Sequence, residues 1–391
     1  MRKVRIGDVG EVITGKTPKT SVSEYYNGNF PFLTPVDFSS LKIIKDTKKT
    51  ISQTGLESIK KCFIPKNSIC VTCIGSDMGK VAVNMMDCAT NQQINSVIPY
   101  KENDYNFIYY AIKNVSHLIK RMGEDSTAVP IVNKTDFSNI YIYCPQKKEE
   151  QIAISKKLKY YDAKIEINTE KISLYSELIQ SVYQKLFDTT YADDLSNDEI
   201  IKGWRKKPFK DFLKLSTEKI GSEKAPVYSA TNNGITLRDE KFSKKLSKSL
   251  NNNKKIVQDD LIFGLSREIL NFGVFKDTIG SVSPAYQIFK IDKTVILPFI
   301  LELEIRSNMY KYMDILQLGA REGQGIRKEY LFQKDFLVPP MELQLRFEEI
   351  ARPIEWKIAN LKEENEVLAE IRDTLLPKLM SGELPVEVGE N

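Results

Sequence analysis

The sequence has a single histidine, His117, among its 391 residues, and it has no run of about 18 apolar residues. One imidazole leaves almost no material for a catalytic triad, a histidine-rich metal site or a histidine acid–base pair. The missing apolar run, and the absence of a signal-peptide pattern at the start, predict a protein that is neither secreted nor embedded in a membrane.

Cysteine is also scarce. The five cysteines all lie in the first half of the chain: Cys62, Cys70, Cys73, Cys88 and Cys144. An odd number confined to one half argues against a disulfide framework and predicts a reducing, cytoplasmic environment. Four of them could form a zinc site, but only Cys70 and Cys73 are spaced as a metal-binding pair. We therefore expect buried free thiols and no metal.

The chain does contain enough apolar residues, 41%, to build packed cores. Its length suggests two or three domains. The net charge is +5, but it is unevenly placed: residues 1–145 carry +5, residues 204–340 carry +8 and residues 341–391 carry −6. Two basic blocks suit a polyanionic partner such as a nucleic acid. A solubilising surface charge explains them equally well.

An internal repeat organises the whole sequence. Residues 149–187 place seam residues (the a and d positions of a heptad) at alternating steps of four and three. These positions are Ile154, Leu158, Tyr161, Ile165, Asn168, Ile172, Tyr175, Ile179, Val182 and Leu186. A shift of 193 gives Phe347, Ala351, Ile354, Ile358, Leu361, Asn365, Leu368, Arg372, Leu375 and Leu379. The repeat predicts two long coiled-coil helices, over residues 146–188 and 341–382.

The blocks before the helices, residues 1–145 and 204–340, correspond loosely and contain many short β-branched and aromatic runs. At their fronts the correspondence has a shift of 203, which matches Ile6-Gly7-Asp8 with Phe209-Lys210-Asp211. The sequence thus predicts an α+β fold, with two mixed α/β domains separated by two long helices in a pseudo-two-fold repeat. Because the linker, residues 189–203, is short, the second helix must return antiparallel to the first. Residues 383–391 form a tail.

Two features concern the helix pair itself. Asn168 and Asn365 occupy seam positions near the centre, and we expect them to form a buried pair that fixes the register. The alternative is two unrelated, partly exposed asparagines. Pro353 and Pro377 predict kinks in the second helix.

Each candidate catalytic motif in the sequence lacks a residue or a structural context that the chemistry requires. Gly75 to Lys80 resembles a phosphate-binding loop, but it has three residues between its glycines instead of four and no Ser or Thr after Lys80. Gly319 to Gly325 lacks the strand-then-helix pattern of a dinucleotide site. His117 lies in an amphipathic stretch that is typical of a packed or surface helix. The sequence therefore indicates a binding protein without a cofactor, not an enzyme.

The doubled plan resembles the specificity (S) subunits of type I DNA restriction–modification systems. The motifs that carry this resemblance are Gly10 to Pro18, Phe30 to Phe38, Asn91 to Asn95, Glu150-Gln151 and Leu375 to Gly382. The resemblance implies that residues 1–145 and 204–340 are target-recognition domains, each reading half of a split, double-stranded DNA sequence. It also implies that the helices are spacers that bind two modification methyltransferase subunits, with restriction subunits joining the complete complex.

Lys, Arg and Ser/Thr on loops suit phosphate contacts, whereas Arg, Lys, Asn and Gln suit base edges. In the first block we expect DNA contacts from Lys16, Thr17, Lys19, Ser76, Lys80, Asn91, Gln92 and Gln93. In the second block we expect them from Asn232, Asn233, Ser266, Arg267, Arg321, Gln324 and Arg327. Each of these residues could instead be an ordinary turn or surface residue.

Two other functions fit parts of the sequence. A coiled-coil adaptor that binds only proteins would also need two long helices and two globular domains. An RNA-binding scaffold would share the basic charge, but the Lys/Arg-Gly-aromatic signature of RNA-recognition domains is missing.

Overall fold

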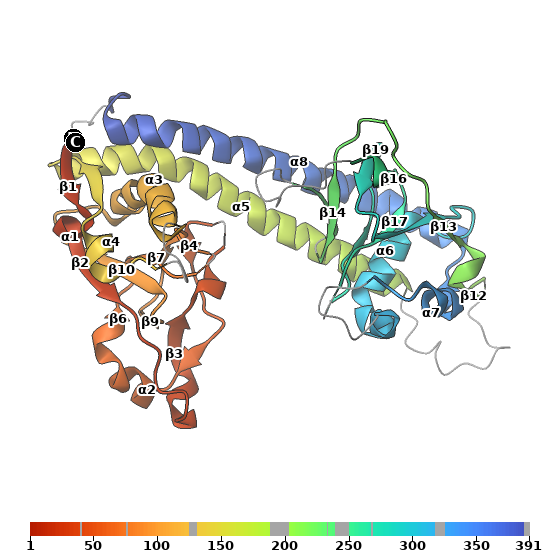
Figure 1. Ribbon diagram of the computed structural model, residues 1–391, viewed down its shortest axis with the longest axis horizontal. Helices are drawn as coiled ribbons and strands as arrows, with labels where there is room; N and C mark the ends of the chain where they lie inside the picture. The colour runs from red at the N-terminus through yellow and green to blue at the C-terminus, as the bar shows by residue number, and fades with distance from the viewer. Residues whose placement is uncertain are drawn as a thin grey trace. The chain divides into compact units, whose positions relative to one another are not determined.

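The structure is a computed structural model that describes residues 1–39, 41–75, 77–124, 131–187, 203–232, 234–238, 250–266, 269–316 and 325–386. The chain divides into two compact units (Figure 1). Unit 1 comprises Met1–Ile172 and Ala359–Asn391, and unit 2 comprises Ser173–Ile358. Among the described residues, no helix is both long and apolar enough to cross a membrane.

Unit 1 is built on two sheets and a strand pair. The first sheet has the order β2 (Gly10–Thr14), β10 (Ile94–Pro99), β7 (Ile69–Thr72), β8 (Val81–Asn84) and β4 (Ile43–Ile44). The second has the order β5 (Thr50–Ile51), β3 (Tyr26–Leu33), β9 (Cys88–Thr90) and β6 (Phe63–Ile64). β1 (Arg2–Arg5) pairs with β11 (Tyr141–Cys144). The shorter helices are α1 (Ile6–Val9), α2 (Gln53–Ser58), α3 (Tyr105–Glu124) and α4 (Lys134–Ser138), with 3-10 turns η1 (Ser23–Tyr25), η2 (Pro35–Asp37) and η3 (Lys60–Cys62).

Unit 2 repeats the central part of this plan. Its main sheet has the order β13 (Leu213–Ser216), β20 (Gln287–Ile291), β17 (Leu261–Phe263) and β18 (Phe272–Val274). The strand pairs are β12 (Arg205–Pro208) with β21 (Asp335–Val338), β14 (Tyr228–Thr231) with β15 (Gly234–Leu237), and β16 (Lys254–Val257) with β19 (Ile279–Val282). The helices are α6 (Pro298–Ser307) and α7 (Lys328–Gln333), with 3-10 segments η4 (Phe209–Asp211), η6 (Leu250–Asn252) and η7 (Met309–Ile315). The predicted mixed α/β repeat is confirmed.

The central strands are apolar on both faces because each lies between two cores. In β7, Ile69 and Val71 enter the core that includes α3, whereas Cys70 enters the core on the other side of the sheet. In β17, Leu261 and Phe263 share one core while Ile262 enters another. The same alternation in both units explains why these strands read as continuous apolar runs in the sequence.

The two long helices are α5 (Lys148–Phe187) and α8 (Met341–Ser381), close to the predicted bounds. All twenty predicted seam positions are buried or half-buried. α8 continues through Pro353 and Pro377 as one helix. Most of the predicted linker, residues 189–202, and the end of the tail, residues 387–391, lie outside the described residues.

The helices pair antiparallel within each unit. In unit 1, Asp162 bonds to Arg372 at 2.7 Å, and Asn168, farther along α5, bonds to Glu364 at 2.9 Å. In unit 2, the rings of Tyr183 and Phe347 lie 5.7 Å apart. The partner number falls as the α5 number rises, which is the antiparallel arrangement that the short linker predicts.

The direct Asn168–Asn365 bond that we expected is replaced by bonds to neighbouring residues. The amide of Asn168 donates to Glu364 at 2.9 Å, and that of Asn365 donates to Thr169 at 3.5 Å. In this register Asn168 lies beside Glu364, the residue before Asn365, and Asn365 lies beside Thr169, the residue after Asn168. The two side-chain amides are therefore not bonded to each other. Bonds from Lys164 and Asn168 lower the pKa of Glu364. The role of the two asparagines in fixing the register stays a prediction.

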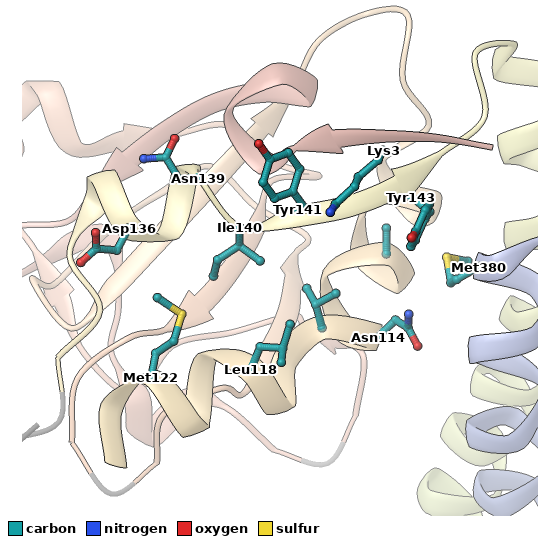
Figure 2. A pocket seen from close by; sticks show the side chains of 12 residues that line it. Lys3, Asn114, Leu118, Met122, Asp136, Asn139, Ile140, Tyr141, Tyr143 and Met380 are labelled. Carbon is teal, nitrogen blue, oxygen red and sulfur yellow. The ribbon is translucent and has the colours of Figure 1, made fainter. Parts of the chain in front are cut away.

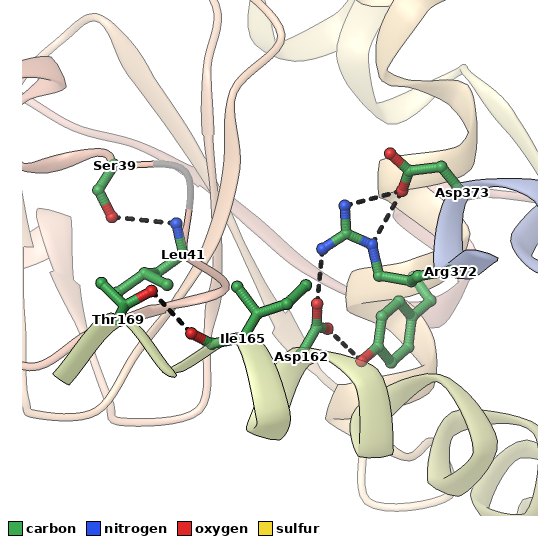
Figure 3. A network of polar contacts seen from close by, with 8 residues as sticks. Ser39, Leu41, Asp162, Ile165, Thr169, Arg372 and Asp373 are labelled. Atoms are coloured by element: carbon green, nitrogen blue, oxygen red, sulfur yellow. Dashed lines mark hydrogen bonds and ion pairs between the residues drawn. The ribbon is translucent and has the colours of Figure 1, made fainter. Parts of the chain in front are cut away.

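A buried charge pair ties three elements of unit 1 together (Figure 3). Asp162 of α5 accepts a hydrogen bond from Tyr110 of α3 and, at 2.7 Å, one from Arg372 of α8. Arg372 also bonds to Asp373 at 2.8 Å. Burial, and then the Asp162 carboxylate, raise the pKa of Tyr110. Only 9% of Asp162 and 14% of the Arg372 side chain are exposed, so neither charge has water as a substitute partner.

Replacing Arg372 by Met should destabilise the protein by about 3 kcal/mol, because the Asp162 charge stays buried without its cation. Urea denaturation followed by far-UV circular dichroism measures the change. Arg352→Met removes an exposed arginine of the same helix, which is paired with Glu348. This control should change stability by less than about 0.5 kcal/mol. Equal losses in the two variants would contradict the assignment, and adding Asp162→Asn to Arg372→Met should recover part of the loss.

Candidate nucleic-acid interface

Three predicted DNA-contact segments of unit 1 meet at one end of its main sheet. β2 runs antiparallel to β10, with Thr14 opposite Asn95, and β10 runs antiparallel to β7, with Ile94 opposite Thr72. The chain leaving β2, the connection from β7 to β8 and the turn entering β10 must therefore emerge together. We call residues 15–19, 73–80 and 91–93 the first loop cluster.

Hydrogen bonds join the three loops of this cluster. The backbone N–H of Lys16 donates to the Thr90 carbonyl at 2.8 Å, and the Thr17 hydroxyl donates to Gln92 Oε1 at 2.6 Å. The N–H of Cys73 donates to the Gln93 carbonyl at 2.7 Å. Residues that are up to about 80 positions apart in the sequence thus form one polar surface, as β-sheet pairing permits.

The predicted contacts of the first loop cluster differ in how they are presented. Lys16, Lys19 and Gln92 are exposed. Lys80 is partly exposed and pairs with Asp77 at 3.1 Å. Gln93 is half-buried and accepts a bond from the Asn91 amide at 2.9 Å. Ser76 lies outside the described residues.

Asn91 has a structural task in its turn. It is 8% exposed, and its side-chain oxygen accepts the N–H of Gln93 at 3.1 Å while its amide bonds to the Gln93 side chain. Because its polar atoms are used within the turn, we leave Asn91 out of the set proposed to contact DNA.

Two exposed lysines of an element that contacts β2 were missed by sequence reasoning. η3 contacts β2. Burial raises the pKa of the Cys62 thiol, and the nearby positive charge of Lys16 partly offsets that rise. Lys60 and Lys61, which precede Cys62, are exposed. The only sequence signal was an adjacent Lys-Lys pair without any turn motif, which is usual on any protein surface.

Gly15 is required where the first loop crosses the turn at Thr90. An added Cβ would lie 2.2 Å from the Asn91 carbonyl oxygen and 2.2 Å from Thr90 Oγ1, which no real Cβ tolerates. Lys16 is therefore presented by a close backbone approach that only glycine permits.

Gly15→Ala should destabilise unit 1 by about 1–3 kcal/mol, because the loop must move away from the backbone at Thr90 and Asn91. Thermal unfolding measures the loss. Gly7→Ala is the matched control, since its Cβ would lie 3.4 Å from Ser138, an ordinary contact. A Gly15→Ala protein as stable as the control would show that the loop does not pack as described.

Unit 2 places a second loop cluster at the equivalent end of its sheet. Ser216 lies opposite Ile288 and Phe263 lies opposite Gln287, so the segments after β13, between β17 and β18, and before β20 emerge together. The Gln287 amide donates to the Ile326 carbonyl at 2.6 Å, which brings in residues 325–327. We call residues 217–223, 264–271, 283–286 and 325–327 the second loop cluster, of which residues 267 and 268 lie outside the described residues.

The predicted DNA contacts of unit 2 differ in exposure and in the bonds that their side chains make, and their contact with DNA stays a prediction. Ser266 is 4% exposed, and its hydroxyl accepts the Asn271 N–H at 2.8 Å, so it shapes the loop and we leave it out of the proposed contact set. Arg327 is half-buried, donates to the Asp314 carbonyl at 2.6 Å and stacks on Tyr330.

The remaining predicted residues of unit 2 lie at another turn or outside the described residues. Asn232 is exposed at the turn between β14 and β15, where its carbonyl accepts from Arg306 at 2.9 Å. Asn233, Arg267, Arg321 and Gln324 lie outside the described residues.

Lys219 is a residue of the second loop cluster that sequence reasoning missed. It is exposed and follows β13 as Lys16 follows β2. The shift of 203 at the fronts of the two blocks maps Lys16 onto Lys219, so the signal was present in the sequence.

A groove of about 580 Å³ opens elsewhere in unit 1 (Figure 2). It lies between α3 and the β1–β11 pair and is lined mainly by apolar and aromatic side chains, among them Leu118, Met122 and Tyr141. The Lys3 ammonium lies 4.6 Å from the centre of the Tyr141 ring.

The cysteines are buried free thiols, as expected. Burial raises the pKa of Cys73 and of Cys88 to about 12, so neither is a thiolate at neutral pH. Among the described residues, no group of three or more His, Cys, Asp or Glu side chains could hold a metal ion.

Comparisons with known proteins point to one family. Residues 1–174 match the family model for the type I restriction modification DNA specificity domain. The chain is 25% identical to the type I restriction enzyme MjaIX specificity subunit of Methanocaldococcus jannaschii, over 98% of this chain and 93% of that protein. It is 35% identical to the HindI specificity subunit of Haemophilus influenzae, over 37% of this chain and 31% of that protein.

A solved structure shares the fold. The crystal structure of the type I restriction-modification S subunit from M. genitalium superposes with a TM-score of 0.54 at 17% identity. The match covers 97% of this chain and 96% of that one.

Proposed function

We infer that this chain, which belongs to the family of type I restriction–modification specificity subunits, is a non-catalytic subunit that recognises a DNA sequence. The observation that carries the inference is the repeated sheet, with order β2-β10-β7-β8 in unit 1 and β13-β20-β17-β18 in unit 2. The same strand ends present a loop cluster in both units. A coiled-coil adaptor that binds only proteins is not favoured, because nothing in that role requires a polar loop cluster at the same strand ends of both units.

The two loop clusters differ in sequence although their strands correspond. The first presents Lys16, Lys19 and Gln92, and the second presents Lys219. Two unlike readers on one chain suit an asymmetric target with two half-sites, since each set of side chains complements a different pattern of base edges. We propose that residues 1–145 read one half-site and residues 204–340 read the other.

Within each cluster the lysines and the amides suit different parts of the duplex. An exposed ammonium such as that of Lys16 or Lys219 fits a phosphate, because its charge is not directional. The Gln92 amide has both a donor and an acceptor, and its Oε1, which accepts one bond from the Thr17 hydroxyl, has a second lone pair, so the amide fits the paired groups of an adenine edge. We therefore assign Gln92 to base recognition, and Lys16 and Lys219 to positioning on the backbone.

Gln92→Ala should relax one base position in one half of the methylated sequence and leave the other half unchanged. The measurement is genome-wide mapping of methylated sequences in cells that express this chain with its methyltransferase subunit. A good amide contact discriminates against the wrong base by about 1–3 kcal/mol, so the relaxed position should be clearly visible. Changes in both halves, or in neither, would contradict the assignment.

Lys16→Ala and Lys219→Ala are the matched controls for that experiment. Each should weaken duplex binding for all sequences, keep the methylated sequence unchanged and lower the salt slope by about one. An altered methylated sequence in either variant would mean that the lysine reads a base.

The long helices offer equivalent apolar side chains for a partner. In unit 1, Ile152, Val367 and Ile371 are exposed by 45%, 51% and 39%. In unit 2, the residues related by the shift of 193 are Leu345, Leu174 and Leu178, exposed by 47%, 63% and 47%. Exposed apolar residues at recurring positions mark an interaction surface. We propose that each set binds one methyltransferase subunit, with restriction subunits joining the complete complex.

Leu174→Asp with Leu178→Asp should remove one of the two bound methyltransferase subunits, because each helix set then carries charge in place of its apolar contact. Val367→Asp with Ile371→Asp should remove the other, and the combination should remove both. Native mass spectrometry of the purified complex counts the subunits. Gln184→Asp, at an exposed position on a different face of α5, is the control and should keep both. Full occupancy in all variants would rule out this surface.

A further inference from the structure

A glutamine at the start of each long helix is fully buried. Gln151 of α5 is 1% exposed and Gln344 of α8 is 0% exposed. The two positions are related by the repeat shift of 193. Glutamine is mostly a surface residue, so two buried copies at equivalent positions require a specific use of the amide.

Gln151 joins α5 to the segment that enters α3. Its Oε1 accepts the N–H of Asp104 at 2.8 Å, and its Nε2 donates to Asn103 Oδ1 at 3.0 Å and to the Pro145 carbonyl at 3.1 Å. Asn103 in turn donates to the Val9 carbonyl of α1 at 2.9 Å. One amide therefore connects the first turn of α5 with the entry to α3 and, through Asn103, with α1.

Gln344 makes the same kind of connection in unit 2. Its Oε1 accepts the N–H of Leu297, the N-cap of α6, at 2.8 Å. Its Nε2 donates to the Val295 carbonyl at 3.0 Å and to the Pro339 carbonyl at 2.8 Å. Both glutamines thus bond to the residue that precedes a domain helix and to the proline that precedes the long helix.

Only a side-chain amide of this length satisfies both junctions. The oxygen must accept and the nitrogen must donate twice, so a carboxylate would face two acceptors and an apolar side chain would leave backbone groups unpaired. In unit 1 the neighbouring Ser155 hydroxyl reinforces the junction with a 2.9 Å bond to the Asp104 carboxylate.

We propose that Gln151 and Gln344 are positioning residues that fix the direction in which each spacer helix leaves its recognition domain, and so fix the gap between the two half-sites. The proposal rests on the function proposed above. Neither residue lies in a loop cluster, so neither contacts bases. Each instead limits how far its domain can turn on its helix, and a looser junction lets the two readers reach half-sites at more than one separation.

The test uses Gln151→Met and Gln344→Met, which keep the side-chain length and remove the amide. The full chain is expressed with its methyltransferase subunit, and methylated sequences are mapped genome-wide. Both variants should keep the half-site bases of the wild type and add sites whose gap differs by about one base pair, a step of about 3.4 Å along the duplex. The double variant should spread the gap further. Gln184→Met, at an exposed position of α5, should leave the gap fixed.

The other outcomes separate the possible failures. An unchanged gap, with methylation either full or uniformly reduced, would overturn the proposal and leave the glutamines a merely stabilising role. Altered half-site bases would overturn it as well. If the Met variants do not fold, Gln151→Asn and Gln344→Asn carry the same test, since they keep an uncharged amide but shorten the side chain, so that it no longer reaches all of its junction partners. If the wild-type chain directs no two-part methylated sequence, the proposed function itself fails.

Discussion

The largest core of each unit is closed by a helix segment from the other half of the sequence repeat. Leu376, Leu379 and Met380, at the end of α8, pack in the core of unit 1. Ile179, Tyr183 and Phe187, at the end of α5, pack in the core of unit 2. Neither repeat can bury its apolar surface by itself, because the side chains that cover it come from the partner helix. The antiparallel pairing of α5 and α8 is thus a condition for both domains to fold.

The polar contacts between helices and domains are of two kinds. Gln151 and Gln344 are equivalent in position, burial and bonding, and they belong to the plan that the repeats share. The Tyr110–Asp162–Arg372 network belongs to unit 1, whereas unit 2 uses a 2.6 Å bond from Tyr183 to Glu304. The glutamine contacts that the units share maintain the common architecture. The contacts that differ, Tyr110–Asp162–Arg372 in one unit and Tyr183–Glu304 in the other, show that the two repeats have diverged at these positions.

The strands that form the framework of each unit are alike, whereas the loops proposed to recognise DNA differ. Strand order and register repeat between the units, because central strands lie between two cores and tolerate few changes. The loops at the strand ends contact solvent, so they are free to differ in length and in side chains. A protein of this design can therefore keep its partners and its helices while the loop clusters, and with them the sequence that is read, change.

The sequence by itself determined the elements whose signal is periodic or repeated. The heptad steps located both long helices and all their seam positions, because a buried helix face must recur every three or four residues. The family motifs located the loops at Lys16 and Gln92. Tertiary structure alone decided which side chains of those loops are exposed: Asn91 and Ser266 are polar in the sequence but use their polar atoms inside their own turns. It also decided that Asn168 faces Glu364 and not Asn365, and that Gln151 and Gln344 close their junctions. These facts depend on atoms brought together from distant positions, and local patterns of residue type carry no record of such distances.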